Sequence, residues 1–220
     1  MQGLTASNPS EQTALLVVDI QPDFMPDGPL AVAGGDEILA PIADLMDRGK
    51  YRLVLATQDW HPAGHISFAS SHAGKGDFDV IDLYGHDQVL WPDHCVQGTP
   101  GAELVRGLDW RRAAAVIRKG MEPDTDSYSG FRNNWNPRGV RPATGLAGYL
   151  RERGIEHVYL CGLARDYCVK WSAEDAASAG FATTVIWDLT RAVDPEADGE
   201  VRQSLERAGV RIVTSAGELI

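Results

Sequence analysis

Residues Ala14-Leu15-Leu16-Val17-Val18-Asp19 set the pattern of the fold, because a run of apolar residues that ends in two β-branched valines is followed by a carboxylate. Continuous apolar runs of this kind are typical of strands that are covered on both faces, as in a parallel sheet. Similar runs recur at residues 53–56, 114–117, 158–161, 183–186 and 210–213. The sequence therefore predicts about six parallel strands.

Helical patterns separate these runs. Apolar residues recur at helical spacing near residues 38–46, 146–150 and 201–208, and a further helix is predicted over 166–177. A glycine suited to a left-handed cap follows each helix: Gly49, Gly154, Gly180 and Gly209. The alternation predicts one α/β domain over residues 1–220, a doubly wound, mainly parallel six-stranded sheet with helices on both faces. Ligands of such sheets bind beyond the carboxyl ends of the strands.

Two segments depart from this alternation. Residues 59–110 are rich in Gly, His, Asp and Pro and show no sustained period, so we interpret them as an insertion over the edge of the sheet. Within this insertion, residues 71–90 match no pattern of strand or helix. Residues 1–12 are expected to form a loose tail.

The charge balance excludes two classes of partner. The chain has 20 Lys+Arg against 31 Asp+Glu, a net charge of −11, which disfavours binding to nucleic acid or to an anionic membrane. No apolar run reaches the roughly 18 residues of a membrane span, and residues 1–8 lack the features of a signal peptide. Three cysteines cannot all pair within one chain, so we expect a cytoplasmic, reducing compartment. Six tryptophans leave both a monomer and a homo-oligomer open.

Three reactive residues follow predicted strands. Asp19, Lys119 and Cys168 lie where the carboxyl ends of the strands would bring them together. Cys168 falls in the first turn of the predicted helix 166–177, where the helix dipole favours a thiolate, so Cys168 is a candidate nucleophile. Asp19 could act as its base, and Lys119 could stabilise the anions by charge. In the alternative interpretation, these residues are a buried apolar cysteine, a turn cap and a surface lysine.

A second group contains a carboxylate and imidazoles. Asp59 follows the second predicted strand, and His61, His65 and His94 follow it along the chain. Such side chains suit Zn²⁺, Fe²⁺ or Mn²⁺. Because Pro62 separates His61 from His65, the two imidazoles are not a helical pair and need not share a face. The alternative is that these are loop histidines that cap turns.

Together these segments resemble the nicotinamidase/pyrazinamidase family of the isochorismatase-like cysteine hydrolases. The similar stretches are residues 18–24, 56–62, 91–96, 119–120 with 126–131, and 162–169. The resemblance implies that Cys168 is the nucleophile, Asp19 the base and Lys119 the third member of a catalytic triad. It also implies a cis peptide at Leu163–Ala164, which would aim the N–H groups of Ala164 and Cys168 at the oxyanion.

The resemblance also implies a metal ion and a substrate. Asp59, His61 and His94 become the ligands of one divalent ion, with His65 or water as the fourth ligand. Zinc is the expected ion, with iron and manganese as alternatives. Phe24 and Trp91 would sandwich a pyridine ring between aromatic faces.

The implied reaction is hydrolysis of nicotinamide to nicotinate and ammonia through a Cys168 thioester, as part of NAD salvage, and pyrazinamide is a second expected substrate. Another amidase of the superfamily, metal-independent and acting on a carbamoyl or ureido group, is the nearest alternative. A non-catalytic Rossmann-like binding protein is another. Arg165 departs from the small or hydroxyl residue common in the family, and its charge is expected to alter pocket access or the pKa of the thiol.

Overall fold

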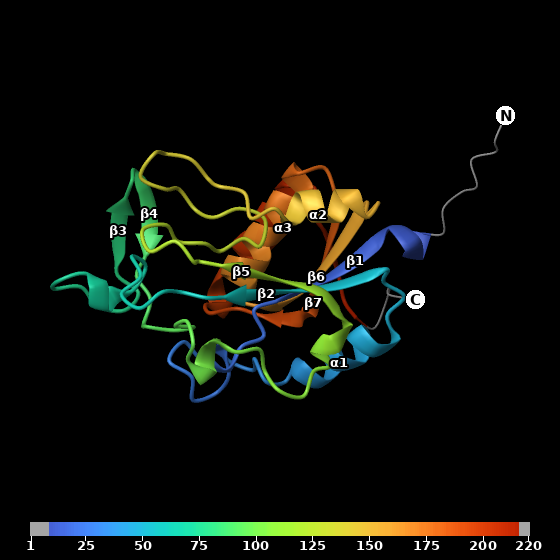
Figure 1. The fold of residues 1–220 in the computed structure, drawn as a ribbon, viewed down its shortest axis with the longest axis horizontal. Coiled ribbons are helices and arrows are strands. Elements are labelled where there is room, and N and C mark those ends of the chain that lie inside the picture. Colours follow the sequence, from blue (N-terminus) through green and yellow to red (C-terminus); the bar gives the residue numbers. More distant parts are fainter. Residues whose placement is uncertain (1–8, 216–220) are drawn as a thin grey trace.

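A six-stranded parallel sheet forms the centre of the protein. The computed structural model describes residues 9–215 (Figure 1). The strands of the sheet are β1 (Thr13–Val18), β2 (Leu53–Asp59), β5 (Ala113–Lys119), β6 (His157–Leu163), β7 (Ala182–Arg191) and β8 (Arg211–Val213). Their order is β5-β2-β1-β6-β7-β8, and every neighbouring pair is parallel. The structure confirms the six predicted strands and the doubly wound sheet.

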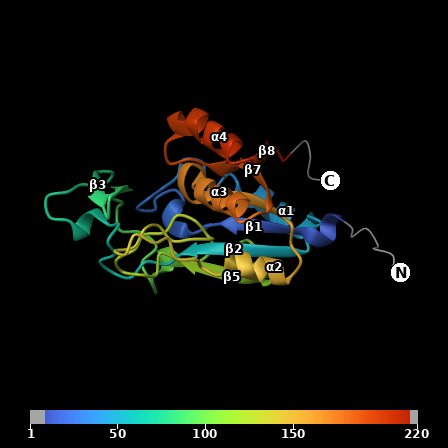
Figure 2. The ribbon, with the colours of Figure 1, turned by 90° about the horizontal axis from the view of Figure 1, so that it is seen from above.

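Helices cover both faces of this sheet, as predicted. In Figure 1, α1 (Leu39–Arg48) lies on one side, and α2 (Leu146–Glu152) and α3 (Lys170–Ser178) lie on the other. The fourth helix, α4 (Asp198–Arg207), packs beside α3 and β8 (Figure 2). The apolar stripe of each helix is buried against the strands. No helix within residues 9–215 has the length and hydropathy that a membrane span needs.

Three of the four predicted glycine caps have the expected conformation. Gly154, Gly180 and Gly209 have φ values of 68°, 91° and 77°. Gly49 differs, because its φ is −62° and its backbone is extended. A Cβ on Gly49 would lie 2.4 Å from the carbonyl oxygen of Leu45, so close backbone packing, rather than a left-handed turn, requires glycine there.

The insertion contains a hairpin that the sequence analysis missed. β3 (Val80–Leu83) and β4 (His86–Val89) form an antiparallel pair away from the central sheet, at the left of Figure 1. Tyr84 and Gly85 connect the two strands with φ values of 58° and 84°, as in a tight two-residue hairpin loop. Asp82 interrupts the apolar residues of β3 and three of the four residues of β4 are polar, so neither strand has the continuous apolar run used to find the other strands. The predicted tail differs too: Pro9–Gln12 forms a 3-10 turn, and residues 1–8 lie outside the described residues.

The carboxyl ends of four adjacent strands place the candidate residues at one edge of the sheet. Asp19 follows β1, and Asp59 and Lys119 pair at the ends of β2 and β5. Gly162 pairs with Val18 where β6 runs beside β1. The φ of Gly162 is 112°, and a Cβ there would lie 2.1 Å from the carbonyl oxygen of Val18. This glycine therefore lets the turn after β6 approach the end of β1.

Gly162→Ala should lower the free energy of unfolding by about 3 kcal/mol, because it combines a positive φ with a backbone clash. Gly148→Ala is the matched control: Gly148 lies inside α2 with open space around its Cα. That control should stabilise the protein by about 0.5–1 kcal/mol, since alanine favours a helix. Urea unfolding followed by circular dichroism measures both values. Equal effects of the two substitutions would contradict this account.

Candidate active site

The ammonium of Lys119 joins the three predicted triad residues. Lys119 Nζ lies 2.9 Å from Asp19 Oδ2 and 3.3 Å from Cys168 Sγ. It also lies 2.7 Å from Asp59 Oδ1 and donates to the carbonyl oxygen of Ser127 at 3.2 Å. The Lys119 side chain has no exposed surface. The structure therefore brings all three residues together around one buried positive charge.

One oxygen of Asp19 is available to accept a proton. Asp19 has a φ of 46°, and its N–H donates to Thr57 Oγ1 at 3.1 Å. The Thr57 hydroxyl in turn donates to Asp19 Oδ1 at 2.5 Å. Asp19 Oδ2 accepts no hydrogen bond from any described residue, although the Lys119 ammonium lies close to it. Thr57, which the sequence analysis missed, thus fixes the carboxylate with Oδ2 turned toward the Lys119 ammonium.

The charges of this cluster depend on one another. Burial alone would lower the pKa of Lys119, but the Asp19 and Asp59 carboxylates outweigh it and hold that pKa well above its usual value. Burial alone would raise the pKa of Asp59, but Lys119 and His61 hold it well below 3.8. For Asp19, burial prevails over Lys119 and raises the pKa. Lys119 and Asp59 therefore stay ionised, and Asp19 is the more basic carboxylate.

Cys168 is a protonated thiol in this environment. Burial raises the pKa of Cys168 well above its usual value, and the Asp19 and Asp59 carboxylates add to the shift that Lys119 opposes. Burial therefore opposes the stabilisation of a thiolate that the sequence predicted at this helix N-terminus. Cys168 lies in a π-helical turn, Arg165–Val169, before α3 begins, and it is 6% exposed. Ionisation of the thiol therefore needs a base, and an oxygen of Asp19 lies within 4.8 Å of Sγ.

The backbone before Cys168 has the predicted conformation. The peptide Leu163–Ala164 is cis. The carbonyl of Ala164 accepts hydrogen bonds from the N–H groups of Tyr167 and Val169 at 3.2 and 3.0 Å. The N–H of Ala164 has no hydrogen-bond acceptor among residues 9–215. That N–H is therefore free to bind an oxyanion, as its predicted role requires.

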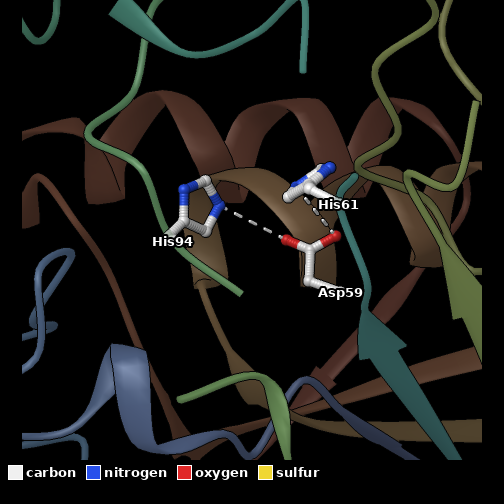
Figure 3. Close-up of side chains that lie close together, drawn as sticks. All are labelled: Asp59, His61 and His94. Carbon is white, nitrogen blue, oxygen red and sulfur yellow. Dashed lines mark ion pairs between the residues drawn. The ribbon is translucent and has the colours of Figure 1, made fainter. Parts of the chain in front are cut away.

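Asp59, His61 and His94 form a buried cluster beside the triad (Figure 3). The Nε2 atoms of His61 and His94 lie 3.5 and 3.6 Å from the two oxygens of Asp59. Each histidine binds a backbone carbonyl through Nδ1, that of Gly120 at 3.0 Å and that of Pro92 at 2.8 Å. The Nε2 atoms of both histidines therefore face Asp59. A carboxylate and two imidazoles with fixed tautomers fit a divalent transition metal ion.

Residues that the sequence analysis missed hold these ligands in place. Gln21 bonds both backbone groups of Asp59, at 2.7 and 2.8 Å. Asp23 Oδ2 accepts the N–H of Cys95, next to His94, at 2.6 Å. Gly120 has a φ of 66°, and a Cβ there would lie 2.3 Å from the His61 ring. Gln21 and Asp23 belong to the stretch after β1 that resembles the family, and polar residues directly after an apolar run were the available signal.

The structure places His65 beside His61 but not on Asp59. The two imidazole centroids are 4.3 Å apart. His65 Nδ1 contacts Ser67 Oγ at 2.7 Å, and Nε2 contacts the carbonyl oxygen of Glu122 at 3.0 Å. Burial lowers the pKa of His65 to about 4. Both ring nitrogens therefore have protein partners in this conformation, and ligation by His65 stays a prediction.

One cavity contains the nucleophile, the cluster of Asp59, His61 and His94, and both predicted aromatic residues. Phe24 and Trp91 line it together with Cys168. The indole N–H of Trp91 donates to Tyr128 Oη at 3.3 Å, and Gln88 of β4 donates to the same oxygen at 3.1 Å. The missed hairpin therefore supports the wall of the cavity through Gln88, and Tyr128 was a further residue that sequence reasoning did not find.

Arg165 does not enter this cavity. Its guanidinium forms an ion pair with Asp198 of α4 at 2.6 Å and lies over the Trp187 ring. It is absent from the residues that line the cavity. The expectation that its charge alters access to the pocket was therefore wrong, because the side chain turns toward β7 and α4.

Comparisons with known proteins agree with this geometry. The sequence profile of the family described as Isochorismatase domain matches residues 13–217. The nicotinamidase of Acinetobacter baylyi is 47% identical over 210 residues, which cover 94% of each chain. A solved nicotinamidase/pyrazinamidase of Acinetobacter baumannii is 44% identical, with a TM-score of 0.87 over 93% of this chain and 97% of that one. A pyrazinamidase of Pyrococcus horikoshii, solved in complex with zinc, is 37% identical, with a TM-score of 0.74 over 92% and 99%.

Lys119→Met should lower the free energy of unfolding by about 3–5 kcal/mol near neutral pH, because two buried carboxylates lose their counter-charge. Lys119 lowers the pKa of Asp59 in the folded state, so this contribution is present at neutral pH and is lost as the pH falls through that pKa. Urea unfolding at about pH 7 and about pH 2 should therefore show a smaller difference in acid.

Lys50→Met is the control for this prediction. Lys50 is exposed, and its substitution should change the free energy of unfolding by no more than about 0.5 kcal/mol at either pH. A similarly small effect of Lys119→Met would show that Lys119 does not balance the carboxylates.

Proposed function

The chain belongs to the isochorismatase family, and on that premise we propose that it is a nicotinamidase, which hydrolyses nicotinamide to nicotinate and ammonia. The observation that carries this proposal is the convergence of Asp19, Lys119 and Cys168 around one buried ammonium. The same cavity also presents the imidazoles of the Asp59 cluster. A binding protein without catalysis has no need of a carboxylate and an ammonium held beside a buried thiol.

The first half of the reaction forms a thioester on Cys168. Asp19 Oδ2 takes the thiol proton while Sγ attacks the carboxamide carbon, because the raised pKa of Cys168 leaves little thiolate beforehand. The C–S bond forms and the carbonyl oxygen becomes an oxyanion, which the N–H groups of Ala164 and Cys168 bind. Asp19 then gives its proton to the nitrogen as the C–N bond breaks, and ammonia leaves.

The second half of the reaction releases nicotinate. Asp19 takes a proton from water while the water oxygen attacks the thioester carbon. The C–S bond breaks and Cys168 regains the proton from Asp19, so the enzyme returns to its starting state. Lys119 keeps its charge throughout and balances the carboxylates on either side. The raised pKa of Asp19 suits a residue that accepts and donates a proton in turn.

The cavity binds the pyridine ring. Phe24 and Trp91 offer aromatic surfaces to the two faces of the ring, and the supporting contacts of Trp91 fix its orientation. Asp59, His61 and His94 would hold a divalent ion, and the zinc complex of the Pyrococcus horikoshii relative favours zinc. Such an ion supplies a Lewis-acidic site for the ring nitrogen and for water.

The name of the Acinetobacter baumannii relative supports pyrazinamide as a second substrate. Pyrazinamide, like nicotinamide, has a six-membered aromatic ring that carries a carboxamide. We propose that the nicotinate it produces enters NAD salvage. Three free cysteines suit a reducing compartment, which supports a cytoplasmic location.

Purified protein should release ammonia from nicotinamide, and Cys168→Ala should reduce kcat by at least about 1,000-fold, because no other group can form the thioester. Cys161→Ala is the matched control: Cys161 is buried in β6 and does not line the cavity. It should keep wild-type activity. Ammonia release is measured by a coupled assay, and a Cys168→Ala enzyme within about tenfold of wild type would overturn the cysteine mechanism.

His94→Ala should bind zinc at least about 100-fold more weakly, because one of three protein ligands is lost. Metal content after dialysis, measured by mass spectrometry, should fall, and the KM for nicotinamide should rise. His157→Ala is the control, since His157 contacts Thr184 away from the cavity. Full metal occupancy in His94→Ala would show that the ligand assignment is wrong.

A further inference from the structure

Arg165 uses its whole guanidinium to bind the end of β7 and the start of α4. Nε donates to Thr190 Oγ1 at 2.8 Å, and Nη2 donates to the carbonyl oxygens of Thr190 and Trp187 at 2.8 and 3.4 Å. Nη1 contacts both carboxylate oxygens of Asp198, at 2.7 and 2.6 Å. These five contacts match the five N–H donors of arginine. The residue is 7% exposed.

The stack on Trp187 completes this site. The guanidinium carbon of Arg165 lies 4.1 Å from the centroid of the Trp187 ring. Arg202 of α4 lies 3.7 Å from the same ring. A planar, fully hydrogen-bonded arginine that also stacks cannot be replaced by lysine without loss of contacts.

The next residue ties the same turn to a second segment. Asp166 accepts the N–H of Val193 at 3.0 Å and that of Asp194 at 2.8 Å. Val193 lines the cavity that contains Cys168. Two consecutive side chains therefore fix the beginning of the π-helical turn: Arg165 binds β7 and α4, and Asp166 binds the segment that follows β7.

Arg165 and Asp166 stand in the chain between Ala164 and Cys168, the two residues that the proposed reaction uses. Arg165 directly follows Ala164, whose N–H is unpaired, and Cys168 lies on the same turn. Oxyanion donors and a nucleophile must hold their geometry to a fraction of an ångström, and a displacement of about 1 Å can cost 100-fold in rate. A rotation of this turn would move the N–H of Ala164 and the sulfur of Cys168 together.

We propose that Arg165 is a positioning residue for the hydrolysis, which anchors the turn of Ala164 and Cys168 to β7 and α4 through Thr190 and Asp198. The proposal rests on the proposed function for its kinetic consequences. Arg165 is not among the residues that line the cavity, so its loss acts on the chemical steps through the turn, and the ring-binding residues Phe24 and Trp91 belong to other segments.

The test compares Arg165→Met, Arg165→Lys and Asp198→Asn with wild type in nicotinamide hydrolysis. Arg165→Met should lower kcat by at least about 30-fold and change KM by less than about threefold, because the turn carries Ala164 and Cys168 but neither Phe24 nor Trp91. Arg165→Lys should recover only part of the loss, since it restores a charge for Asp198 without the bonds to Thr190. Asp198→Asn should have the smallest effect, because Asp198 is partly exposed.

Arg202→Met is the matched control. Arg202 stacks on the same Trp187 ring, but no hydrogen bond or ion pair among the described residues joins it to the turn. Its substitution should leave kcat unchanged even if the melting temperature falls as it does in Arg165→Met. Equal kcat values for folded Arg165→Met and Arg202→Met would overturn the proposal and leave Arg165 a purely structural residue. If Arg165→Met does not fold, wild-type kcat in both Arg165→Lys and Asp198→Asn would overturn it equally.

Alkylation of Cys168 by iodoacetamide separates this proposal from the proposed function. A wild-type protein that releases no ammonia from nicotinamide would overturn the function. Even in that case, iodoacetamide should alkylate Cys168 at least about fivefold more slowly in Arg165→Met than in Arg202→Met. The reason is that a displaced thiol loses its contact with the base Asp19. Equal or faster alkylation, measured by peptide mass spectrometry, would overturn the positioning role.

Discussion

The buried charge of Lys119 is the constraint on which the site depends. An ammonium without solvent contact stays ionised only beside opposite charges, and the structure supplies two carboxylates from neighbouring strands. Asp19 and Asp59 are thereby fixed at the ends of β1 and β2, within reach of Cys168 on one side and of the histidines on the other. The triad and the metal-binding cluster are thus parts of one electrostatic unit, joined through Lys119.

The strand order explains how these residues meet. The chain runs outward from β1 through β2 to β5 and then returns to place β6 on the other side of β1. Ligand sites of doubly wound sheets occur where the strand order reverses, beyond the carboxyl ends. Here that position receives the base from β1, the ammonium from β5 and the nucleophile from the turn after β6. Gly162 allows this turn to approach because it carries no Cβ.

Sequence patterns predicted the features that depend on local periodicity. Strands of the central sheet contain apolar runs, so all six could be predicted. The positions of Asp19, Lys119 and Cys168 after such runs could be predicted as well. Features set by distant contacts could not. The neutral thiol of Cys168 results from burial among carboxylates on other strands. The direction of Arg165 is set by acceptors on β7 and α4, and the hairpin lacks an apolar run.

In the proposed reaction, Cys168 is activated by Asp19 beside Lys119 and forms a covalent intermediate with the carbonyl carbon of nicotinamide. The most direct test is rapid acid quenching during turnover, followed by mass spectrometry of the intact protein and of its peptides. We predict a transient mass increase equal to one nicotinoyl group, located on Cys168. Steady release of ammonia with no adduct at any quench time, or with the adduct on another residue, would contradict the account.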